Sequence, residues 1–361
     1  MSERVFAERG PWLFSRRIDL CVFGGSALCS CLLLALGAAS GWLNQDTPEW
    51  TWLGCVVAID VAHVWSTGFR VYFSASELRA RPLLYLGVPA LAYLSGVALH
   101  AVSPLAFWRG LAYLAVFHFV RQQVGFMKLY GRRNPAQTHL DSVCDRAAVT
   151  LAMVYPLIFW HAEQPRAFVW FVPGDFVTAT EVLALARAAL PFARAACLLA
   201  LVAFFARQLV LWRRGRWVPG KLVLVCATFS CWVLGIVVFD SDYAFTVSNV
   251  ILHGVPYFVL THRYARASGQ PSLARRIAVR GVVPFVSLCV VLALLEESLW
   301  DRLVWHERPD YFGDVFPLDA LTLVFVVPLL AVPQITHYVL DGFVWRVRSE
   351  NPVLRRELES A

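Results

Sequence analysis

Ten long apolar segments dominate this chain of 361 residues. Each is close to the roughly 20 residues that a helix needs to cross a hydrocarbon layer about 30 Å thick. Hydrophobic residues make up 58% of the chain, whereas a soluble domain has roughly 45–50%. We expect spans at about 18–42, 51–72, 83–103, 105–127, 146–162, 190–212, 221–240, 243–262, 279–299 and 318–344. The sequence therefore predicts an all-α, polytopic helical bundle in a membrane.

Basic residues predict how these helices are oriented, because cytoplasmic loops retain an excess of Lys and Arg. Most of the 32 Lys and Arg residues fall on one side when the N-terminus is assigned to the cytosol. This pattern predicts about ten helices with both termini cytosolic, in a single transmembrane domain over residues 1–361. The expected cytosolic ends are a segment 1–17 and a tail 346–361, and the longer outer loops are about 163–189 and 300–317. The net charge of +7 thus reports topology, and we expect no nucleic-acid partner.

The balance between the two basic residue types predicts which membrane holds the protein. Lys128 and Lys221 are the only lysines, and all other basic side chains except histidine are arginines. Such a bias indicates a GC-rich bacterial genome. We therefore expect a bacterial cytoplasmic (inner) membrane, with membrane lipid as the surrounding partner.

Four histidines lie deep inside predicted spans, at His63, His118, His253 and His337. The first basic residue that marks the cytosolic end follows each of them by seven to ten residues. At about 1.5 Å per residue, all four lie roughly 10–15 Å from that boundary. Ionisable side chains at membrane depth are rare and usually face the bundle interior, where they serve a site. We therefore expect the four imidazoles to converge at one level.

Polar companions follow or precede each of these histidines by three or four residues, which places them on the same helical face. A single intramembrane histidine is more often an interhelical hydrogen-bonding residue, so the prediction of a site rests on the shared depth of all four. Imidazoles and carboxylates bind transition metals, and further carboxylates and amides orient the ligands. The predicted catalytic and metal-binding residues are Asp60, His63, His118, His253, His337 and Asp341. Orienting residues or weaker ligands are predicted at Gln122, Asn249, Gln334 and His262.

The predicted donor set indicates the chemistry. A mostly nitrogen set suits non-haem iron, as one or two ions, and zinc, copper and manganese also accept it. The sequence leaves open whether Asp60 and Asp341 bind the ion or orient a histidine. Oxidation of a hydrocarbon needs a centre shielded from water. We expect a membrane oxidoreductase that hydroxylates, desaturates or oxidatively cleaves a lipid, fatty-acyl or isoprenoid substrate, with an electron donor as partner.

Three basic residues, Arg70, Arg121 and Lys128, are expected on the cytosolic side of this site. They fit two roles. They can mark topology at the membrane boundary, or they can bind the anionic headgroup of a substrate whose chain extends towards the metal.

Two other functions fit the same residues. The histidines and aspartates could form the proton or metal pathway of a transporter, or the four histidines could ligate b-type haems in an electron carrier. Haem stacked in pairs would need ligands at two depths, and no matching halves of a transporter repeat are evident. The HxxxH and HxxHH clusters of membrane desaturases and hydroxylases are absent, so no family is assigned.

Overall fold

The computed structural model describes residues 10–45, 47–134, 136–269 and 271–346. Every regular element in these ranges is a helix, and no strand occurs among them, so the prediction of an all-α chain is confirmed. Most of the predicted cytosolic segment 1–17 and nearly all of the tail 346–361 lie outside the described residues.

Nine helices of the described chain are long and apolar enough to cross a membrane, which supports an integral membrane protein. They cover Arg16–Ser40, Glu49–Arg70, Pro82–Val102, His139–Ala162, Thr180–Arg213, Pro219–Val238, Asp242–Ala267, Val282–Trp305 and Ala320–Val344. A tenth helix, α8 (Pro104–Gly131), has 28 residues but is not among the nine. Its apolar sequence is interrupted by the polar residues His118, Arg121 and Gln122. The count of ten spans and the cytosolic termini remain predictions.

Several of these spans consist of consecutive helical segments. The first contains α2 (Arg16–Asp19), η1 (Leu20–Gly24) and α3 (Gly25–Ser40), and the second contains α4 (Glu49–Thr51), η3 (Trp52–Val61) and α5 (Ala62–Arg70). Three further spans are single helices: α7 (Pro82–Val102), α9 (His139–Ala162) and α10 (Thr180–Arg213). The remaining four are composite: α11 (Pro219–Trp232) with η4 (Val233–Val238); α12 (Asp242–Phe245) with η5 (Thr246–Val250) and α13 (Ile251–Ala267); α15 (Val282–Trp300) with η6 (Asp301–Trp305); and α17 (Ala320–Leu330) with α18 (Val332–Val344). Short helices η2 (Trp42–Asn44), α6 (Ala75–Ala80), α14 (Leu273–Ala278) and α16 (Pro309–Phe312) lie in the connections.

Two helices begin earlier than predicted. The span expected at 146–162 begins at His139, because Thr138 and Asp141 form a capping box that satisfies the first backbone donors of α9. The span expected at 190–212 is α10, which begins at Thr180 and therefore shortens the predicted outer loop 163–189. The predicted loop 300–317 contains the helical segments η6 and α16.

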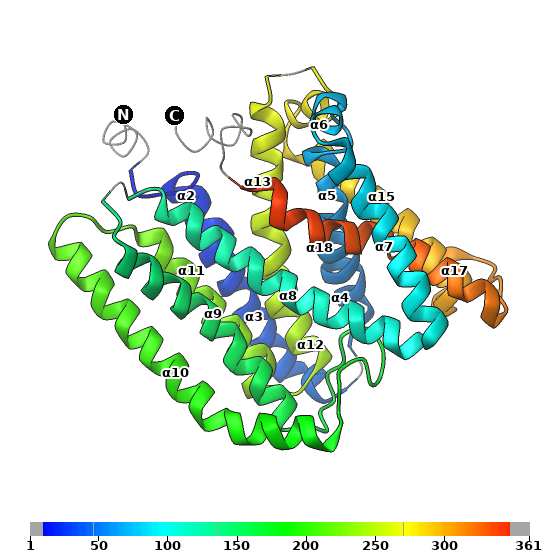
Figure 1. Cartoon of the computed structure of the whole chain (residues 1–361), viewed down its shortest axis with the longest axis horizontal. Coiled ribbons are helices and arrows are strands. Elements are labelled where there is room, and N and C mark those ends of the chain that lie inside the picture. Colours follow the sequence, from blue (N-terminus) through cyan, green and yellow to red (C-terminus); the bar gives the residue numbers. More distant parts are fainter. Residues whose placement is uncertain (1–9, 46, 135, 270, 347–361) are drawn as a thin grey trace.

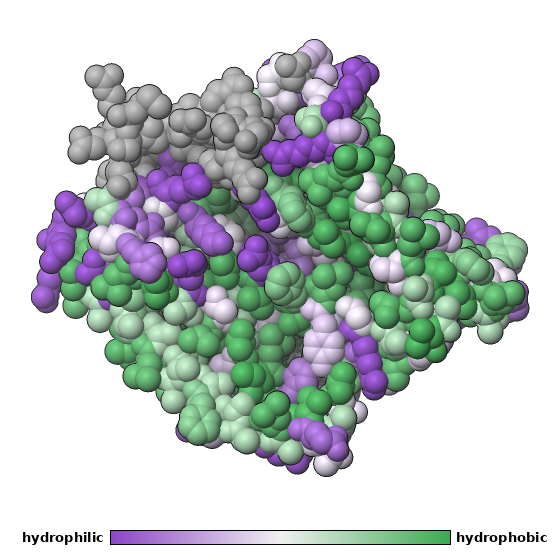
Figure 2. All heavy atoms as spheres, in the orientation of Figure 1, coloured by the Kyte–Doolittle hydropathy of each residue, from purple (hydrophilic) through white to green (hydrophobic). Residues whose placement is uncertain are grey.

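The bundle has a central helix with helices grouped around it. Asp242–Ala267, which includes α13, is the most buried of the nine spans. Figure 1 shows α9, α10 and α11 on one side of the molecule and α7, α15 and α17 on the other, with α8 and α18 crossing between them. Figure 2 shows a broad hydrophobic surface, with hydrophilic residues gathered mainly towards the upper end of this face.

Stretches of π-helix precede two of the four histidines. The ten-residue stretch η3 ends two residues before His63, and the five-residue stretch η5 ends three residues before His253. A π-helical turn contains more residues than an α-helical turn, so it changes the face on which the following residues lie, and such turns are frequent at functional sites. These stretches therefore determine where the two imidazoles point.

The two spans that carry these histidines touch at Gly254. A Cβ atom at Gly254 would lie 2.6 Å from Ile59 Cγ2 and 3.2 Å from the Ile59 carbonyl oxygen. The same Cβ atom would lie 3.6 Å from His63 Nδ1. The absence of a side chain at Gly254 therefore lets α13 approach the second span beside His63.

We predict that Gly254→Ala destabilises the protein by about 1–3 kcal/mol, because the added methyl group overpacks the contact with Ile59. Gly87→Ala is the matched control, since nothing lies within 4 Å of a Cβ atom at that helical position. Thermal unfolding of the two purified variants in the same detergent measures the difference. A Gly254→Ala protein as stable as the Gly87→Ala protein would contradict the prediction.

Candidate metal centre

The four histidines of the predicted site meet in the bundle interior. His63 lies on α5, His118 on α8, His253 on α13 and His337 on α18. One ring nitrogen from each lies within 4.8 Å of those from the other three. Each residue is at most 1% exposed. This buried four-histidine group could hold a transition-metal ion.

The spacing of one pair of rings, His118 and His337, fits donors that share one ion. His118 Nε2 lies 3.1 Å from His337 Nε2. Two nitrogens each about 2.1 Å from an ion are roughly 3.0 Å apart at a right angle and roughly 3.4 Å apart at a tetrahedral angle. The ring of His63 lies 4.7 Å from that of His253 and 4.8 Å from that of His337, nearly perpendicular to both. The four rings therefore surround a common point.

Polar atoms contact the Nδ1 side of two of these rings, those of His63 and His337. His63 Nδ1 lies 3.2 Å from the carbonyl oxygen of Ile59 and 3.7 Å from Asp60 Oδ1. His337 Nδ1 lies 2.7 Å from the hydroxyl of Thr67. A proton on Nδ1 that is donated to such an acceptor leaves the lone pair on Nε2. The contacts therefore favour the tautomer in which Nε2 can bind an ion.

His118 is approached from behind by a carboxylate on another helix. Its Nδ1 atom lies 3.7 Å from Asp341 Oδ2. Asp341 also follows His337 by four residues on α18, and its described contact with the group is the one to His118 on α8. A carboxylate can reach a neighbouring helix when the two pack closely, and helical spacing alone does not show this.

His253 has the least satisfied ring of the four. Neither Nδ1 nor Nε2 has a hydrogen-bond partner in the described structure. The ring stacks on Phe119, with centroids 3.6 Å apart and planes 8° from parallel. A buried polar atom without a partner costs about 1–3 kcal/mol. A bound ion would satisfy one of the two nitrogens.

The two carboxylates lie outside the group of four nitrogens, each behind one ring. A divalent cation among four neutral imidazoles would be an uncompensated charge in the apolar interior, which is costly. Asp60 and Asp341, when ionised, together carry the charge that balances such a cation. Their position suits residues that orient histidines and neutralise the ion.

The four residues predicted as orienting residues or weaker ligands have other partners. None of them forms a hydrogen bond to a ring nitrogen of the group in the described chain. Gln122 donates to the His253 carbonyl (2.8 Å), Asn249 to the Cys231 carbonyl (3.4 Å) and Gln334 to the Tyr338 hydroxyl (2.9 Å), while His262 lies 3.1 Å from the Ala278 carbonyl. Gln122 and Gln334 still support the site. Gln122 holds the backbone of His253, and Gln334 holds Tyr338, which stacks on the ring of His118.

Thr67 and Tyr338 are contacts that the sequence reasoning missed. Thr67 follows His63 by four residues, so the sequence places both on the same helical face. Its hydrogen bond to His337 on another helix was not expected, because a buried threonine usually bonds to its own helix. Tyr338 stacks on the ring of His118 at 4.7 Å and 27°. It is adjacent in sequence to His337 and reaches the neighbouring histidine across the interface between α18 and α8.

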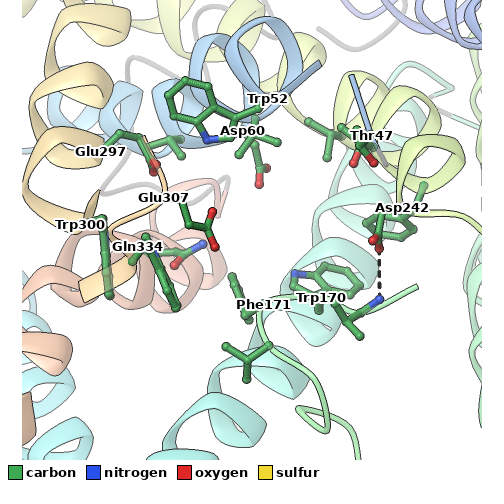
Figure 3. A pocket seen from close by; sticks show the side chains of 18 of the residues that line it. Thr47, Trp52, Asp60, Trp170, Phe171, Asp242, Glu297, Trp300, Glu307 and Gln334 are labelled. Carbon is green, nitrogen blue, oxygen red and sulfur yellow. Dashed lines mark hydrogen bonds between the residues drawn. The ribbon is translucent and has the colours of Figure 1, made fainter. Parts of the chain in front are cut away.

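A cavity of about 550 Å³ ends beside the group. Two of its lining residues contact the group, since Asp60 lies beside His63 and Phe119 stacks on His253. Figure 3 shows Asp60 and Glu307 pointing into it, opposite Trp170 and Phe171. Its other aromatic and acidic lining residues include Trp52, Trp108, Trp300, Trp305, Asp242, Glu296 and Glu297. We call this space the aromatic cavity.

The loop that bears Trp170 and Phe171 is held in place by a buried carboxylate. Asp175 Oδ2 accepts backbone hydrogen bonds from Trp170, Phe171 and Val172, at 3.0, 2.6 and 3.2 Å. Burial raises the pKa of Asp175, and these hydrogen bonds oppose that shift. The loop is therefore anchored as one wall of the aromatic cavity.

A second cavity of about 310 Å³ lies on the other side of the group. On α8, His118 lies between Trp108, which lines the aromatic cavity, and Arg121, which lines the second. On α18, His337 lies between Gln334 and Asp341 in the same way. The histidines therefore separate two cavities. Because Arg121 and Lys128 line the second one, we call it the basic cavity.

Arg70, predicted either to mark topology or to contact a headgroup, has several partners within the protein. It is 3% exposed. Its guanidinium donates to Glu77 (2.8 Å) and to the carbonyl oxygen of Val344 (3.0 Å), and it lies 4.1 Å from the ring centre of Tyr264. Arg70 therefore ties the end of α5 to the end of α18. Helical spacing alone could not show that Val344 approaches Arg70.

Known proteins offer no guide to this centre. No protein family, curated protein or solved structure matches the chain. Function is therefore inferred from the residues themselves, which are four buried imidazoles with two carboxylates behind them. Such donors suit zinc, copper and iron.

We predict that Arg70→Gln lowers the free energy of unfolding by about 1–3 kcal/mol, because Glu77 and the Val344 carbonyl lose a charged donor. Arg79→Gln on the exposed face of α6 is the control, and it should change stability little. Thermal unfolding in detergent compares the two. Equal melting temperatures would show that Arg70 does not tie the two helices.

Proposed function

We propose that this chain is an integral-membrane, metal-dependent oxidoreductase that acts on an apolar, lipid-like substrate. The observation that carries the proposal is the buried group of four histidines, each with a ring nitrogen within 4.8 Å of the others. Polar groups this deep in an apolar bundle are costly and usually functional. A bound ion accounts for all four at once.

The spacing favours one ion over two. Sites with two ions hold them roughly 3.5–4 Å apart, and carboxylate ligands are typical of such pairs in helical bundles. Here Asp60 and Asp341 lie behind two different imidazoles, outside the group of four nitrogens. Imidazole donors suit iron, copper and zinc, and an oxidation requires a redox-active metal. We therefore favour a single non-haem iron ion, which would supply the redox chemistry.

The aromatic cavity supports an apolar substrate. Its volume falls within the roughly 300–1,000 Å³ of ligand sites, and tryptophan rings line much of it. Phe119 lines this space and stacks on the ring of His253, so it shields that ring from water. The tryptophan rings offer an apolar surface for a fatty-acyl or isoprenoid chain, beside the carboxylates that also line the cavity. Hydroxylation, desaturation and oxidative cleavage all require a hydrocarbon to be held beside a dry metal site.

The protein's own residues have separable roles in this proposal. The four imidazoles bind the ion, while Thr67 and the Ile59 carbonyl fix the tautomers of His337 and His63. Asp60 and Asp341 balance the charge of the ion. Loss of such orienting residues typically costs 10–100-fold in metal affinity.

The geometry does not favour a haem protein. A porphyrin between any two of these histidines would occupy the space that holds the other two rings. Two haems would need two separated pairs of ligands. The four nitrogens instead form one compact group.

A metal or proton pathway is the second candidate function. The cavities on opposite sides of the histidines reach Asp60 and Asp341, which would suit stepwise passage of a cation. The basic residues of the second cavity argue against it, because they repel cations at that mouth. Uptake of zinc or manganese into liposomes that contain the protein, abolished by His253→Ala, would favour the pathway over the enzyme.

We predict about one transition-metal ion per chain in the purified protein, and a loss of most of it in His63→Ala and in His337→Ala. Each change removes one of four donors, so the remaining three hold the ion more weakly. His262→Ala is the control, because this buried histidine lies outside the group. Elemental analysis by mass spectrometry measures the content. Unchanged metal in both variants would refute the site.

We further predict oxygen-dependent conversion of a hydrocarbon by the iron-loaded protein with a chemical reductant. Squalene and methyl oleate serve as isoprenoid and fatty-acyl probes, and mass spectrometry detects a gained oxygen, lost hydrogens or a cleaved chain. Product should fall at least about 100-fold in His253→Ala, because catalysis needs the bound ion. His161→Ala is the control and should retain activity, because His161 lies at the end of α9 and outside the histidine group. Equal product from the His253→Ala protein would contradict the proposal.

A further inference from the structure

The basic cavity has a charge pattern of its own. Four cationic residues, one carboxylate and a tyrosine line it. The cationic residues are Arg121, Lys128, Arg132 and Arg346, and the others are Asp341 and Tyr257. Asp341 is the only acidic residue among its described lining residues. The space is therefore strongly positive, in contrast to the aromatic cavity, which several carboxylates line.

The cations from α8 share one face of the helix. Lys128 follows Arg121 by seven residues, and Arg132 follows Lys128 by four, so these side chains project in similar directions. Neither Arg121 nor Lys128 forms an ion pair with a described carboxylate. Exposed cations beside a cavity that are outside any described ion pair attract anions.

Topology alone does not account for this arrangement. Basic residues gather at the cytosolic boundary of membrane proteins, but that role requires only that they face water or headgroups. Here they line a concave space whose opposite end is Asp341 and Tyr257. Tyr257 is 1% exposed, and Asp341 lies 3.7 Å from His118. The cavity thus leads from the basic rim to the edge of the histidine group.

The single carboxylate determines where an anion can sit. Asp341 repels negative charge at the inner end, whereas Arg121 and Lys128 attract it at the rim. Guanidinium and ammonium groups form charge-assisted hydrogen bonds with phosphate and carboxylate oxygens. A ligand would therefore place its anionic group at the rim and the rest of its structure inwards.

We propose that the basic cavity is a binding site for the phosphate or carboxylate group of a ligand that is distinct from the hydrocarbon in the aromatic cavity. This goes beyond the proposed function and does not rest on it, because anion binding requires no metal. The anion comes either from a lipid headgroup or from a small solute, and the same residues would bind both.

Isothermal titration of the purified full chain in a neutral detergent tests this site. The probes are dioctanoyl phosphatidate, inorganic phosphate and the uncharged dioctanoylglycerol. Arg121→Gln/Lys128→Gln should weaken phosphatidate binding roughly tenfold or more, because two charge-assisted hydrogen bonds are lost. Arg213→Gln/Arg214→Gln, at the exposed end of α10, should leave binding unchanged. The single variant Lys128→Gln replaces the double variant if the latter does not fold.

The outcomes separate the two sources of anion. Binding of phosphatidate alone identifies a lipid headgroup, and binding of inorganic phosphate with the same dependence on Arg121 and Lys128 identifies a small anion. Equal binding of dioctanoylglycerol and phosphatidate, equal weakening in the control variant, or no anion binding at all would overturn the proposal. Metal content measured on the same variants should stay unchanged, so the result is independent of the metal centre.

Discussion

The buried imidazole nitrogens of the histidine group need hydrogen-bond partners or a bound ion, and this need is the constraint on which the structure depends. Water cannot serve groups that lie inside an apolar bundle, and an unpaired polar atom there costs free energy. His63 and His337 are satisfied on one side by Ile59 and Thr67, while both nitrogens of His253 have no described partner. The protein therefore maintains a polar centre that only a further group can complete. The helix contacts around it hold that centre together.

Much of this architecture was readable from the sequence because membranes impose strict lengths. The apolar runs predicted all-helical spans, and the similar distances of the four histidines from the basic boundary predicted their common level. Helical periodicity also paired Asp60 with His63. Each of these inferences uses one helix at a time, and the rules of a single helix are well determined.

The parts that were missed depend on how helices pack against one another. Asp341 lies beside His118 on α8, and Arg70 donates a hydrogen bond to the end of α18. Each contact joins two different helices, so the spacing of residues along one helix does not predict it. The two cavities arise from gaps between elements as distant as η3, α15 and the loop 163–179. Such contacts depend on crossing angles and on close approaches such as that at Gly254, which one sequence does not specify.

The second span carries both a member of the histidine group and the hydroxyl that orients another, since His63 and Thr67 are one turn apart. Both lie on α5, which follows the π-helical stretch η3 directly. Insertion or deletion of one residue within η3 would rotate the two side chains together by about 100° and remove both from the centre. The length of η3 is therefore a structural property that the protein must preserve.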